Sequence, residues 1–332
     1  MSEPRTIALG ENAQAIFGPL HRHVAQIQEA FRDPNAPRGT PAYRLTFDAQ
    51  GDKLIITSGP GASAADFERA KRIIDSLLEL ANRKGRIREG EVLAAVAFSE
   101  GQSDTPGPMH LPQLGGLTLR TPRQVHYVGA LRDENIDLIF SVGPAGTGKT
   151  FLAVAAAVEA LKQERVDKII VTRPAVEAGE KLGYLPGDLA EKVDPYLMPI
   201  WDAFRSQMSE NDLKARRERR VIEVAPLAFM RGRTLSNAFV IVDEAQNATI
   251  QQMKMVLTRL GQGSRMVVTG DPTQIDLPNE RMSGLDHALA ILGKMRRIEV
   301  VRFTAQDVMR HDLVAEIVEA YDDDERRRRQ AP

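Results

Sequence analysis

The sequence predicts an α/β protein in which a small α+β domain precedes a doubly wound parallel sheet. From residue 121 onward, short apolar stretches alternate with helical ones, which is typical of βαβ units. Several of the apolar stretches are continuous, as in strands that helices cover on both faces. A glycine-rich turn at residues 143–150 joins one such stretch to a helical one.

The amino-acid composition indicates the class of protein. The chain has 332 residues, of which 42% are hydrophobic and 27% are charged, as in a globular protein of about two domains. It has no cysteine, which excludes disulfides and thiolate zinc sites. No signal peptide is recognised, and the longest apolar stretch, 151–161, is too short to span a bilayer. We therefore expect a cytoplasmic protein without membrane contact.

Residues 1–98 predict the small α+β domain. Apolar residues recur at helical spacing in 67–80, and a further helix is expected at 13–31. Residues 54–57 have the composition of a strand, and Leu45 and Phe47 alternate with polar neighbours as a half-buried strand does. Residues 99–120 are rich in proline and glycine and predict a linker.

Residues 121–322 predict the main domain. Its expected strands are 138–142, 168–172, 221–224, 239–242, 266–269 and 298–303, with helical stretches between them. The remaining residues, 323–332, form a charged tail, for which a solvated, disordered end is favoured over a nucleic-acid contact. The chain has 44 basic and 45 acidic residues and therefore no net positive charge. Nucleic acid could thus bind only at local basic patches.

The glycine-rich turn fits the phosphate-loop pattern G-x-x-x-x-G-K-[ST] without a mismatch. Glycines allow successive backbone N–H groups to point at phosphate oxygens, and the following helix adds its positive end. Lys149 is expected to reach the β- and γ-phosphates, and Thr150 to bind Mg²⁺. The predicted nucleotide-binding residues are Gly143, Pro144, Ala145, Gly146, Thr147, Gly148, Lys149 and Thr150.

Two adjacent acids follow the strand 239–242. Parallel strands deliver such residues to the carboxyl edge of the sheet, where ligands of open α/β folds bind. Asp243 is expected to hold Mg²⁺, and Glu244 to act on the water that attacks the γ-phosphate. Phosphate-transferring kinases and GTPases need no carboxylate at that place, and the Asn-Lys-x-Asp motif of GTPases is absent. The cofactors expected are therefore ATP and Mg²⁺.

Two glutamines are further candidates. Gln274, just past the strand 266–269, could reach the γ-phosphate or its water, although a capped loop is an alternative. Gln124 lies upstream of the first strand of the main domain. Its amide could pair with adenine N6 and N7 together, and an ordinary surface glutamine is the alternative.

Five blocks resemble those of the PhoH-like proteins, bacterial ATPases related to superfamily 1 helicases. The blocks are residues 143–150, 172–174, 179–187, 243–247 and 269–276, and the resemblance covers roughly 121–321. It implies a RecA-like fold, Mg-ATP hydrolysis, a role linked to RNA and an association with phosphate-starvation regulons. For residues 1–98 it implies a domain likened to KH-type RNA-binding modules, although a GXXG clamp is not found there.

A neighbouring subunit is expected to complete the site. Related helicases place ATP between two RecA-like domains, whereas residues 121–322 predict one. We therefore expect a head-to-tail homo-oligomer, and the family resemblance suggests a hexameric ring. Arg310, in the block Asp-Val-Met-Arg-His, is the first candidate for the arginine that contacts the γ-phosphate, and Arg231 and Arg233 are the second.

Contacts with RNA are expected at three places. Arg173 follows a strand at the ligand edge of the sheet, and Lys181 lies in the block 179–187. The basic run 214–220 is a third candidate, with a solvated helix face as the alternative. Bases could stack on the aromatic residues Tyr196, Trp201 and Phe204, for which a core or subunit-interface role is equally open.

Two functions remain open. The first is an RNA-dependent, helicase-like ATPase that remodels RNA or moves along it. The second is a nucleotide-gated assembly or adaptor protein that recruits a partner such as a ribonuclease without unwinding. The motifs for ATP are common to both, so they do not discriminate between them. A small-molecule kinase is disfavoured by Glu244.

Overall fold

The computed structural model describes residues 4–33, 36, 42–100, 111–174, 189–277 and 283–309, with side chains of the helix that starts at 189 described from residue 197. The chain divides into two units, Met1–Val125 and His126–Pro332. The division falls within helix α5 (Pro122–Arg132).

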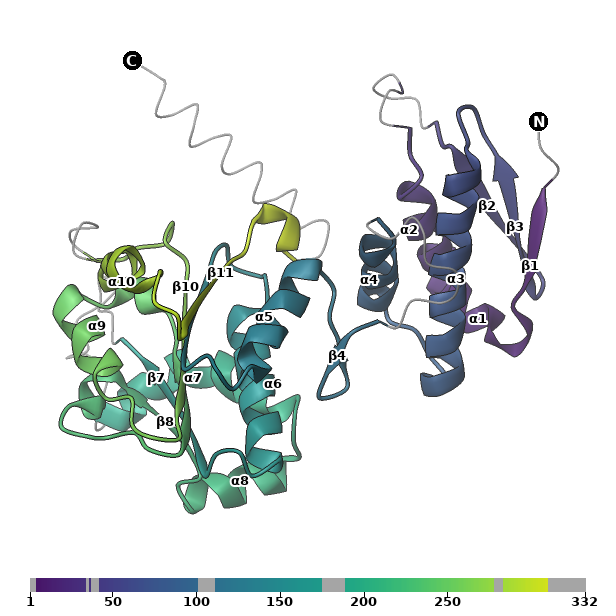
Figure 1. Ribbon diagram of the computed structural model, residues 1–332. Helices are drawn as coiled ribbons and strands as arrows, with labels where there is room; N and C mark the ends of the chain where they lie inside the picture. Colours follow the sequence, from purple (N-terminus) through teal and green to yellow (C-terminus); the bar gives the residue numbers. More distant parts are fainter. Residues whose placement is uncertain are drawn as a thin grey trace. The chain divides into compact units, whose positions relative to one another are not determined.

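A parallel six-stranded sheet is the framework of the second unit (Figure 1). The strand order is β11-β6-β10-β9-β7-β8, and all neighbouring strands run parallel. The strands are β6 (Leu138–Val142), β7 (Lys168–Arg173), β8 (Ile222–Pro226), β9 (Ala238–Val242), β10 (Arg265–Gly270) and β11 (Ile298–Arg302). All six predicted strands are confirmed, with small shifts at their ends.

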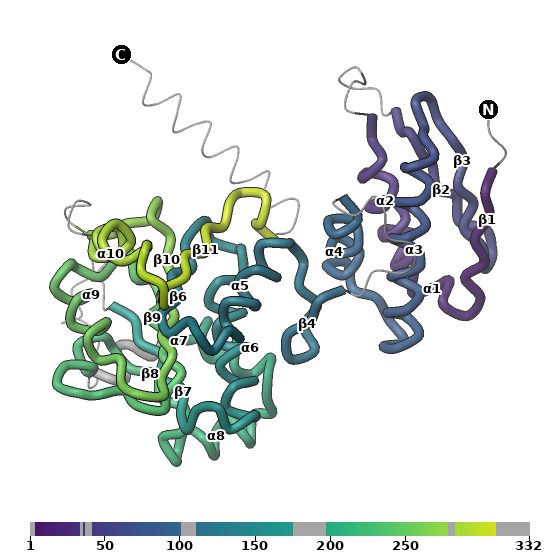
Figure 2. Tube along the Cα trace, in the orientation of Figure 1, coloured from purple at the N-terminus to yellow at the C-terminus, as the bar shows by residue number. Residues whose placement is uncertain are grey.

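Helices cover both faces of this sheet. On one face α6 packs against α7 and over β7, β9 and β10, and on the other α9 and α10 pack together (Figures 1 and 2). Because both faces are covered, every residue of β6 and β9 is buried. The helices are α6 (Lys149–Lys162), α7 (Leu189–Arg205), α8 (Glu210–Glu218), α9 (Ile250–Leu257) and α10 (Gly284–Leu292), with 3₁₀ turns at Leu227–Met230, Ala245–Asn247 and Ala305–Asp307.

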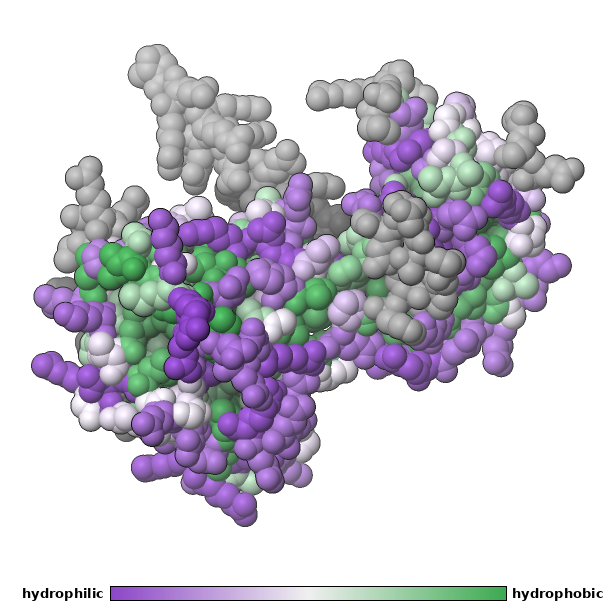
Figure 3. Space-filling model, viewed as in Figure 1, coloured by the Kyte–Doolittle hydropathy of each residue, from purple (hydrophilic) through white to green (hydrophobic). Residues whose placement is uncertain are grey.

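The predicted doubly wound parallel sheet is thus confirmed. Strand β8 forms one edge of this sheet and follows α8 in the chain. The surface around α8 is hydrophilic on the face shown in Figure 3. Among the described residues, no helix combines the length and the apolar character that crossing a lipid bilayer requires.

An antiparallel sheet in the order β1-β3-β2 is the framework of the first unit. Leu45 and Phe47 on β2 are buried, whereas Thr46 and Asp48 between and after them are exposed, so the predicted alternation is confirmed. Helices pack against the buried face (Figure 1). The elements are β1 (Arg5–Ala8), β2 (Leu45–Gln50), β3 (Lys53–Ser58), α1 (Ala13–Phe17), α2 (Arg22–Glu29), α3 (Ala64–Lys84) and α4 (Glu89–Ser99), with 3₁₀ turns at Gly10–Asn12 and Pro19–His21.

The single helix expected at 13–31 is wrong, because the chain forms α1 and α2 there. Gly18 separates them with a φ of 69°, and a Cβ at this position would lie 2.5 Å from the ring of His23. Pro19 follows and has no N–H to continue the helix. The apolar spacing carried no sign of this break, but the Gly-Pro pair did.

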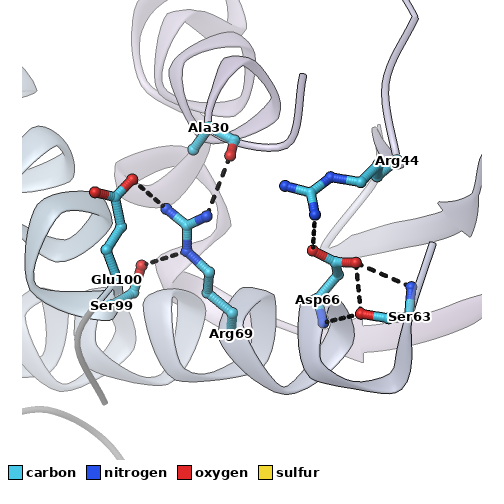
Figure 4. A network of polar contacts seen from close by, with 7 residues as sticks. All are labelled: Ala30, Arg44, Ser63, Asp66, Arg69, Ser99 and Glu100. Carbon is cyan, nitrogen blue, oxygen red and sulfur yellow. Dashed lines mark hydrogen bonds and ion pairs between the residues drawn. The ribbon is translucent and has the colours of Figure 1, made fainter. Parts of the chain in front are cut away.

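Helix α3 begins at a capping box. Ser63 Oγ accepts a hydrogen bond from the backbone N–H of Asp66, and Asp66 Oδ2 accepts one from that of Ser63 (Figure 4). Arg44 forms an ion pair with Asp66 at 3.1 Å, which joins α3 to the start of β2. One turn further on, Arg69 holds α3 to its neighbours through Ala30 O, Ser99 Oγ and Glu100 Oε1.

A buried carboxylate joins α3, α4 and the hairpin of β4 (Gln113–Leu114) and β5 (Leu117–Thr118). Glu91 Oε1 accepts hydrogen bonds from Lys84 Nζ at 2.8 Å and Thr118 Oγ1 at 3.2 Å, and its Oε2 accepts one from the N–H of Arg88. Burial alone would raise the pKa of Glu91, but the hydrogen bonds from Lys84 and Arg88 outweigh burial and lower it. The ionised form is therefore the stabilising one.

Glu91→Gln is expected to lower the free energy of unfolding by about 2 kcal/mol at neutral pH, because charge-assisted hydrogen bonds are lost. Since the folded-state pKa lies below the unfolded one, the contribution is present above the ordinary glutamate pKa and is lost as the pH falls through the lowered value. Urea unfolding of both chains between neutral and acid pH measures this. Equal unfolding midpoints at neutral pH would contradict it.

Candidate functional site

The glycine-rich turn 143–150 lies where β6 ends and α6 begins, at the carboxyl edge of the sheet. The N–H of Gly143 donates to Gly270 O, the last residue of β10, at 3.1 Å. The N–H of Phe303, just past β11, donates to Val142 O at 2.7 Å. The turn is therefore held by the strands on both sides of β6.

Glycine is required at three positions of this turn. Gly143, Gly146 and Gly148 have φ values of 138°, 83° and 85°, which side chains rarely allow. A Cβ on Gly143 would also lie 2.4 Å from Phe303 O. Thr147 Oγ1 donates to Pro144 O at 3.0 Å and closes the turn from within.

Lys149 is buried beneath the turn, with its side chain directed at the turn's own carbonyls. Its Nζ donates to Gly143 O at 2.6 Å and Pro144 O at 2.7 Å. The hydroxyl of the buried Tyr127 donates to the backbone oxygen of Lys149 and supports it from below. Burial lowers the pKa of Lys149, and the charges of Asp271, Glu244 and Asp243 offset part of that effect. The ammonium thus lies among three acids from two segments, the ends of β9 and β10.

Asp243, which directly follows β9, joins the turn to the end of β10. Its Oδ1 accepts hydrogen bonds from Thr150 Oγ1 at 2.6 Å and from Thr269 Oγ1 at 2.7 Å. The carboxylate is 6% exposed, and its Oδ2 accepts no hydrogen bond from the described residues. Asp243 and Thr150, predicted as metal ligands from separate motifs, are therefore in direct contact. The role of Thr269 was not predicted, although it is the first residue of the block 269–276.

Glu244 has a left-handed backbone conformation, with a φ of 52°. Non-glycine residues adopt it at a cost of about 1–3 kcal/mol, and such residues are concentrated at functional sites. Its carboxylate accepts a hydrogen bond from Gln246 Nε2 at 2.5 Å and lies 3.6 Å from Arg173, the last residue of β7. Arg173 was expected at this edge of the sheet, and the structure adds its ion pair with the catalytic candidate.

Gln246 links the two acidic blocks. While its amide nitrogen contacts Glu244, its Oε1 accepts a hydrogen bond from the N–H of Asp271 at 3.1 Å. Asp271 in turn accepts the N–H and hydroxyl of Thr273, which shapes the loop that leads to Gln274. The role of Gln246 was missed, although it stands within the quoted block 243–247.

One cavity of about 260 Å³ brings most of the predicted site together. Lys149, Thr150, Asp243, Glu244 and Gln274 all line it, although they come from three separate motifs. The other lining residues are Ala145, Gly146, Gly148, Phe151, Thr269, Gly270 and Asp271. Within the described part of the chain, Lys149 is the one cationic side chain among them.

Gly143, Pro144 and Thr147 of the turn do not line this cavity, and Gln124 and Arg310 are not placed in it either. Gln124 belongs to the first unit, where it is buried and its Oε1 accepts a hydrogen bond from the N–H of Arg120; its expected contact with adenine stays a prediction. Arg310 lies outside the described residues. Its neighbour Met309 donates its N–H to Gly146 O at 3.0 Å, so the described chain ends at the turn.

The second-choice arginines differ in their engagement. Arg233 forms two hydrogen bonds of 2.7 Å with the carboxylate of Glu223, whereas Arg231 is exposed. Lys181, in the block 179–187, lies outside the described residues, as do the side chain of Tyr196 and the tail 323–332. Trp201 and Phe204 are buried with ring centroids 6.0 Å apart, so Phe204 is a core residue.

The residues present fit a magnesium–nucleotide complex. Mg²⁺ commonly takes one or two protein oxygens and completes its shell with water and substrate phosphates. Thr150 and Asp243 offer such oxygens at the mouth of the phosphate turn. The described residues contain no cluster of three or more histidines, cysteines and acids that could hold a metal by itself.

Comparison with known proteins agrees with this geometry. Residues 116–322 match the model of the family described as PhoH-like protein. The chain is 48% identical to a PhoH-like protein of Bacillus subtilis over 81% of its own length and 85% of that protein's. For a PhoH-like protein of Mycobacterium tuberculosis the identity is 49%, over 82% and 77%.

Among solved structures, a Sulfolobus solfataricus SWI2/SNF2 ATPase core in complex with double-stranded DNA is similar with a TM-score of 0.35 and 16% identity, covering 59% of this chain and 47% of that one. The sequence matches are decisive, because both the family and several relatives cover most of the chain. The phosphate turn and the family together support a nucleotide-binding ATPase. The chain belongs to the PhoH-like protein family.

Proposed function

We propose that this chain hydrolyses ATP in the presence of Mg²⁺ and couples hydrolysis to the binding or remodelling of RNA. The observation that carries the proposal is the 2.6 Å hydrogen bond between Thr150 and Asp243 within the cavity that also contains Lys149 and Glu244. A phosphate turn, two oxygens for a metal and a second carboxylate at the carboxyl edge of one sheet are the parts that phosphoryl transfer to water requires.

The residues have distinct roles in this proposal. The N–H groups of residues 143–150 and the ammonium of Lys149 bind the polyphosphate, for which Lys149 exchanges its bonds to Gly143 and Pro144. Mg²⁺, when bound at Thr150 and Asp243, would neutralise charge on the β- and γ-phosphates. Glu244 orients the attacking water and accepts its proton. Gln274, on the neighbouring loop, senses the γ-phosphate.

The charge of the cavity supports a shared site. Asp243, Glu244 and Asp271 face the single cation Lys149 among the described lining residues. Arg173, which lies beside the cavity, forms an ion pair with Glu244, so we infer that an arginine that stabilises the transition state, worth about 10³–10⁵ in rate where it occurs, comes from elsewhere. We assign it to Arg310 of a neighbouring copy in a head-to-tail ring, a hexamer by the family resemblance. The engagement of Arg233 with Glu223 makes it a weaker candidate.

Glu244→Gln is expected to keep ATP binding and lose hydrolysis by about 10²-fold or more, because the amide cannot accept the proton of the attacking water. Lys149→Ala should lose binding as well, which makes it the contrasting variant. Calorimetric ATP titration and phosphate release measure the two properties separately. A Glu244→Gln chain that turns over ATP near the wild-type rate would show that another group activates the water.

Thr150→Val is expected to raise the Mg²⁺ concentration for half-maximal ATP turnover by at least about tenfold, whereas Thr150→Ser, which keeps the hydroxyl, should stay within about twofold of wild type. The titration of turnover against Mg²⁺ at saturating ATP decides this. If valine and serine behave alike, the hydroxyl does not hold the metal.

The RNA coupling is tested by ATP turnover with and without single-stranded RNA. The proposal predicts that RNA raises the turnover number of the wild-type chain and leaves Glu244→Gln inactive. Hydrolysis that no RNA changes but that a ribonuclease partner stimulates would instead establish the nucleotide-gated adaptor function.

A further inference from the structure

A second cavity in the ATPase unit lies away from the nucleotide site. It measures about 610 Å³ and lies against the edge strand β8. Lys168 and Ile222, the first residues of β7 and β8, both line it, so it is at the amino ends of these strands. The nucleotide cavity is at the carboxyl ends. The other lining residues are Trp201, Arg217, Arg220, Glu223, Val224 and Arg233.

The charge of this cavity, which we call the β8 groove, is strongly positive. Four cationic side chains line it against the single carboxylate of Glu223, a formal balance of 4 − 1 = +3. Arg233 engages that carboxylate through two hydrogen bonds and thereby lowers the pKa of Glu223. Lys168, Arg217 and Arg220 form no ion pair with any described residue. Lys168 and Arg220 also lower the pKa of Glu223 through their charges, and the groove still has an excess of positive charge that can bind an anion.

The backbone positions one of these cations at a cost. Arg220 follows α8 with a φ of 57°, a left-handed conformation that glycine would adopt without strain. The N–H of Val221 donates to Arg216 O and closes the helix end, so the turn itself does not need an arginine. A strained residue that keeps a long cationic side chain points to a function for that side chain.

Trp201 supplies a second, independent observation. It is 5% exposed, and its indole Nε1–H is buried without an acceptor among the described residues. A buried donor without an acceptor is unfavourable, and native proteins rarely keep one. The guanidinium of the exposed Arg217 lies over the indole, 4.0 Å from the ring centroid. The groove therefore has a planar guanidinium, resting on an aromatic ring, at its surface.

The groove brings together two segments that the sequence marked separately, the basic run 214–220 and the tryptophan of α7. Cations recognise phosphate oxygens, and planar guanidinium groups stack on unpaired bases. An acidic peptide would satisfy the cations but would leave the stacking surface unused. The combination favours a single-stranded polynucleotide.

We propose that the β8 groove, lined by Lys168, Trp201, Arg217 and Arg220, binds the phosphate backbone of single-stranded RNA. The groove lies at the amino ends of the strands, whereas the nucleotide cavity lies at their carboxyl ends. The proposal rests on the RNA coupling proposed above, and it locates that contact. It implies that RNA and ATP reach opposite strand ends of the same sheet.

The test uses Trp201 as its own reporter, because it is the single tryptophan of the chain. An oligouridine of about 20 nucleotides, longer than one typical binding site, is titrated into the full-length protein. Tryptophan emission is recorded together with the anisotropy of a dye on the RNA. We expect the emission to change along the same isotherm as the anisotropy. Binding that leaves the emission unchanged overturns the proposal.

The variant that tests the cations is Arg217→Ala/Arg220→Ala. Two lost phosphate contacts should weaken RNA binding at least about tenfold and reduce the slope of log K against log salt by about 1.4. Arg219→Ala is the matched control, because Arg219 is exposed in the same basic run but does not line the groove. Its RNA affinity and slope should remain near wild type. The thermal midpoints of all chains verify that they are folded.

The outcomes separate this proposal from the proposed function. If the double variant and Arg219→Ala bind RNA equally well, the groove is not the RNA site, although RNA-coupled hydrolysis can stand. If the double variant instead changes the sedimenting mass without changing RNA affinity, the groove is a subunit contact and the proposal is overturned. If the wild type hydrolyses Mg-ATP but binds no oligouridine, both the groove proposal and the RNA coupling fail, while the ATPase assignment remains.

Discussion

The carboxylate oxygen Asp243 Oδ1 is the point on which the nucleotide site depends. It accepts the hydroxyls of Thr150 and Thr269, and so joins the phosphate turn, the end of β9 and the end of β10 through one atom. A buried carboxylate is stable only when such donors replace its hydration. The hydrogen bonds to Oδ1 fix the orientation of the Asp243 side chain and therefore the position of Oδ2. A metal ligand is preorganised when the fold fixes its position in this way.

The surrounding backbone adopts uncommon conformations at the positions that carry the chemistry. Gly143, Gly146 and Gly148 take conformations that keep the turn open to a phosphate, and Glu244 takes a left-handed conformation without being glycine. Gln246 connects that residue to Asp271 on the neighbouring loop. A shift of the loop that contains Gln274 would therefore be transmitted to Glu244 through the amide side chain of Gln246. Arg173 adds a contact from β7, so the position of Glu244 depends on two adjacent strands.

Much of the fold followed from the sequence because its signals are local. The six parallel strands are short apolar runs, and β6 and β9 could be recognised because helices bury both their faces. The helix expected at 13–31 failed where a local signal, Gly18-Pro19, was outweighed by apolar spacing. Lys149, Thr150, Asp243 and Glu244 were found because the motifs of phosphate binding have fixed spacing.

What the sequence did not predict are contacts between residues far apart in the chain. Thr269 and Gln246 act through hydrogen bonds whose partners stand 26 and 25 residues away, and the blocks that contain them do not indicate these contacts. The pairing of Arg217 with Trp201 likewise depends on how α8 packs beside α7. Arg233 was a second candidate for the arginine that contacts the γ-phosphate, yet its bidentate bond to Glu223 appears only in three dimensions.

The most direct test of the account is a crystal structure of the protein with Mg²⁺ and a non-hydrolysable ATP analogue. The account predicts the β- and γ-phosphates within residues 143–150, the metal about 2.1 Å from Thr150 Oγ1, and Asp243 bound to it directly or through one water. Phosphates bound elsewhere, or a metal that Thr150 and Asp243 do not approach, would contradict it.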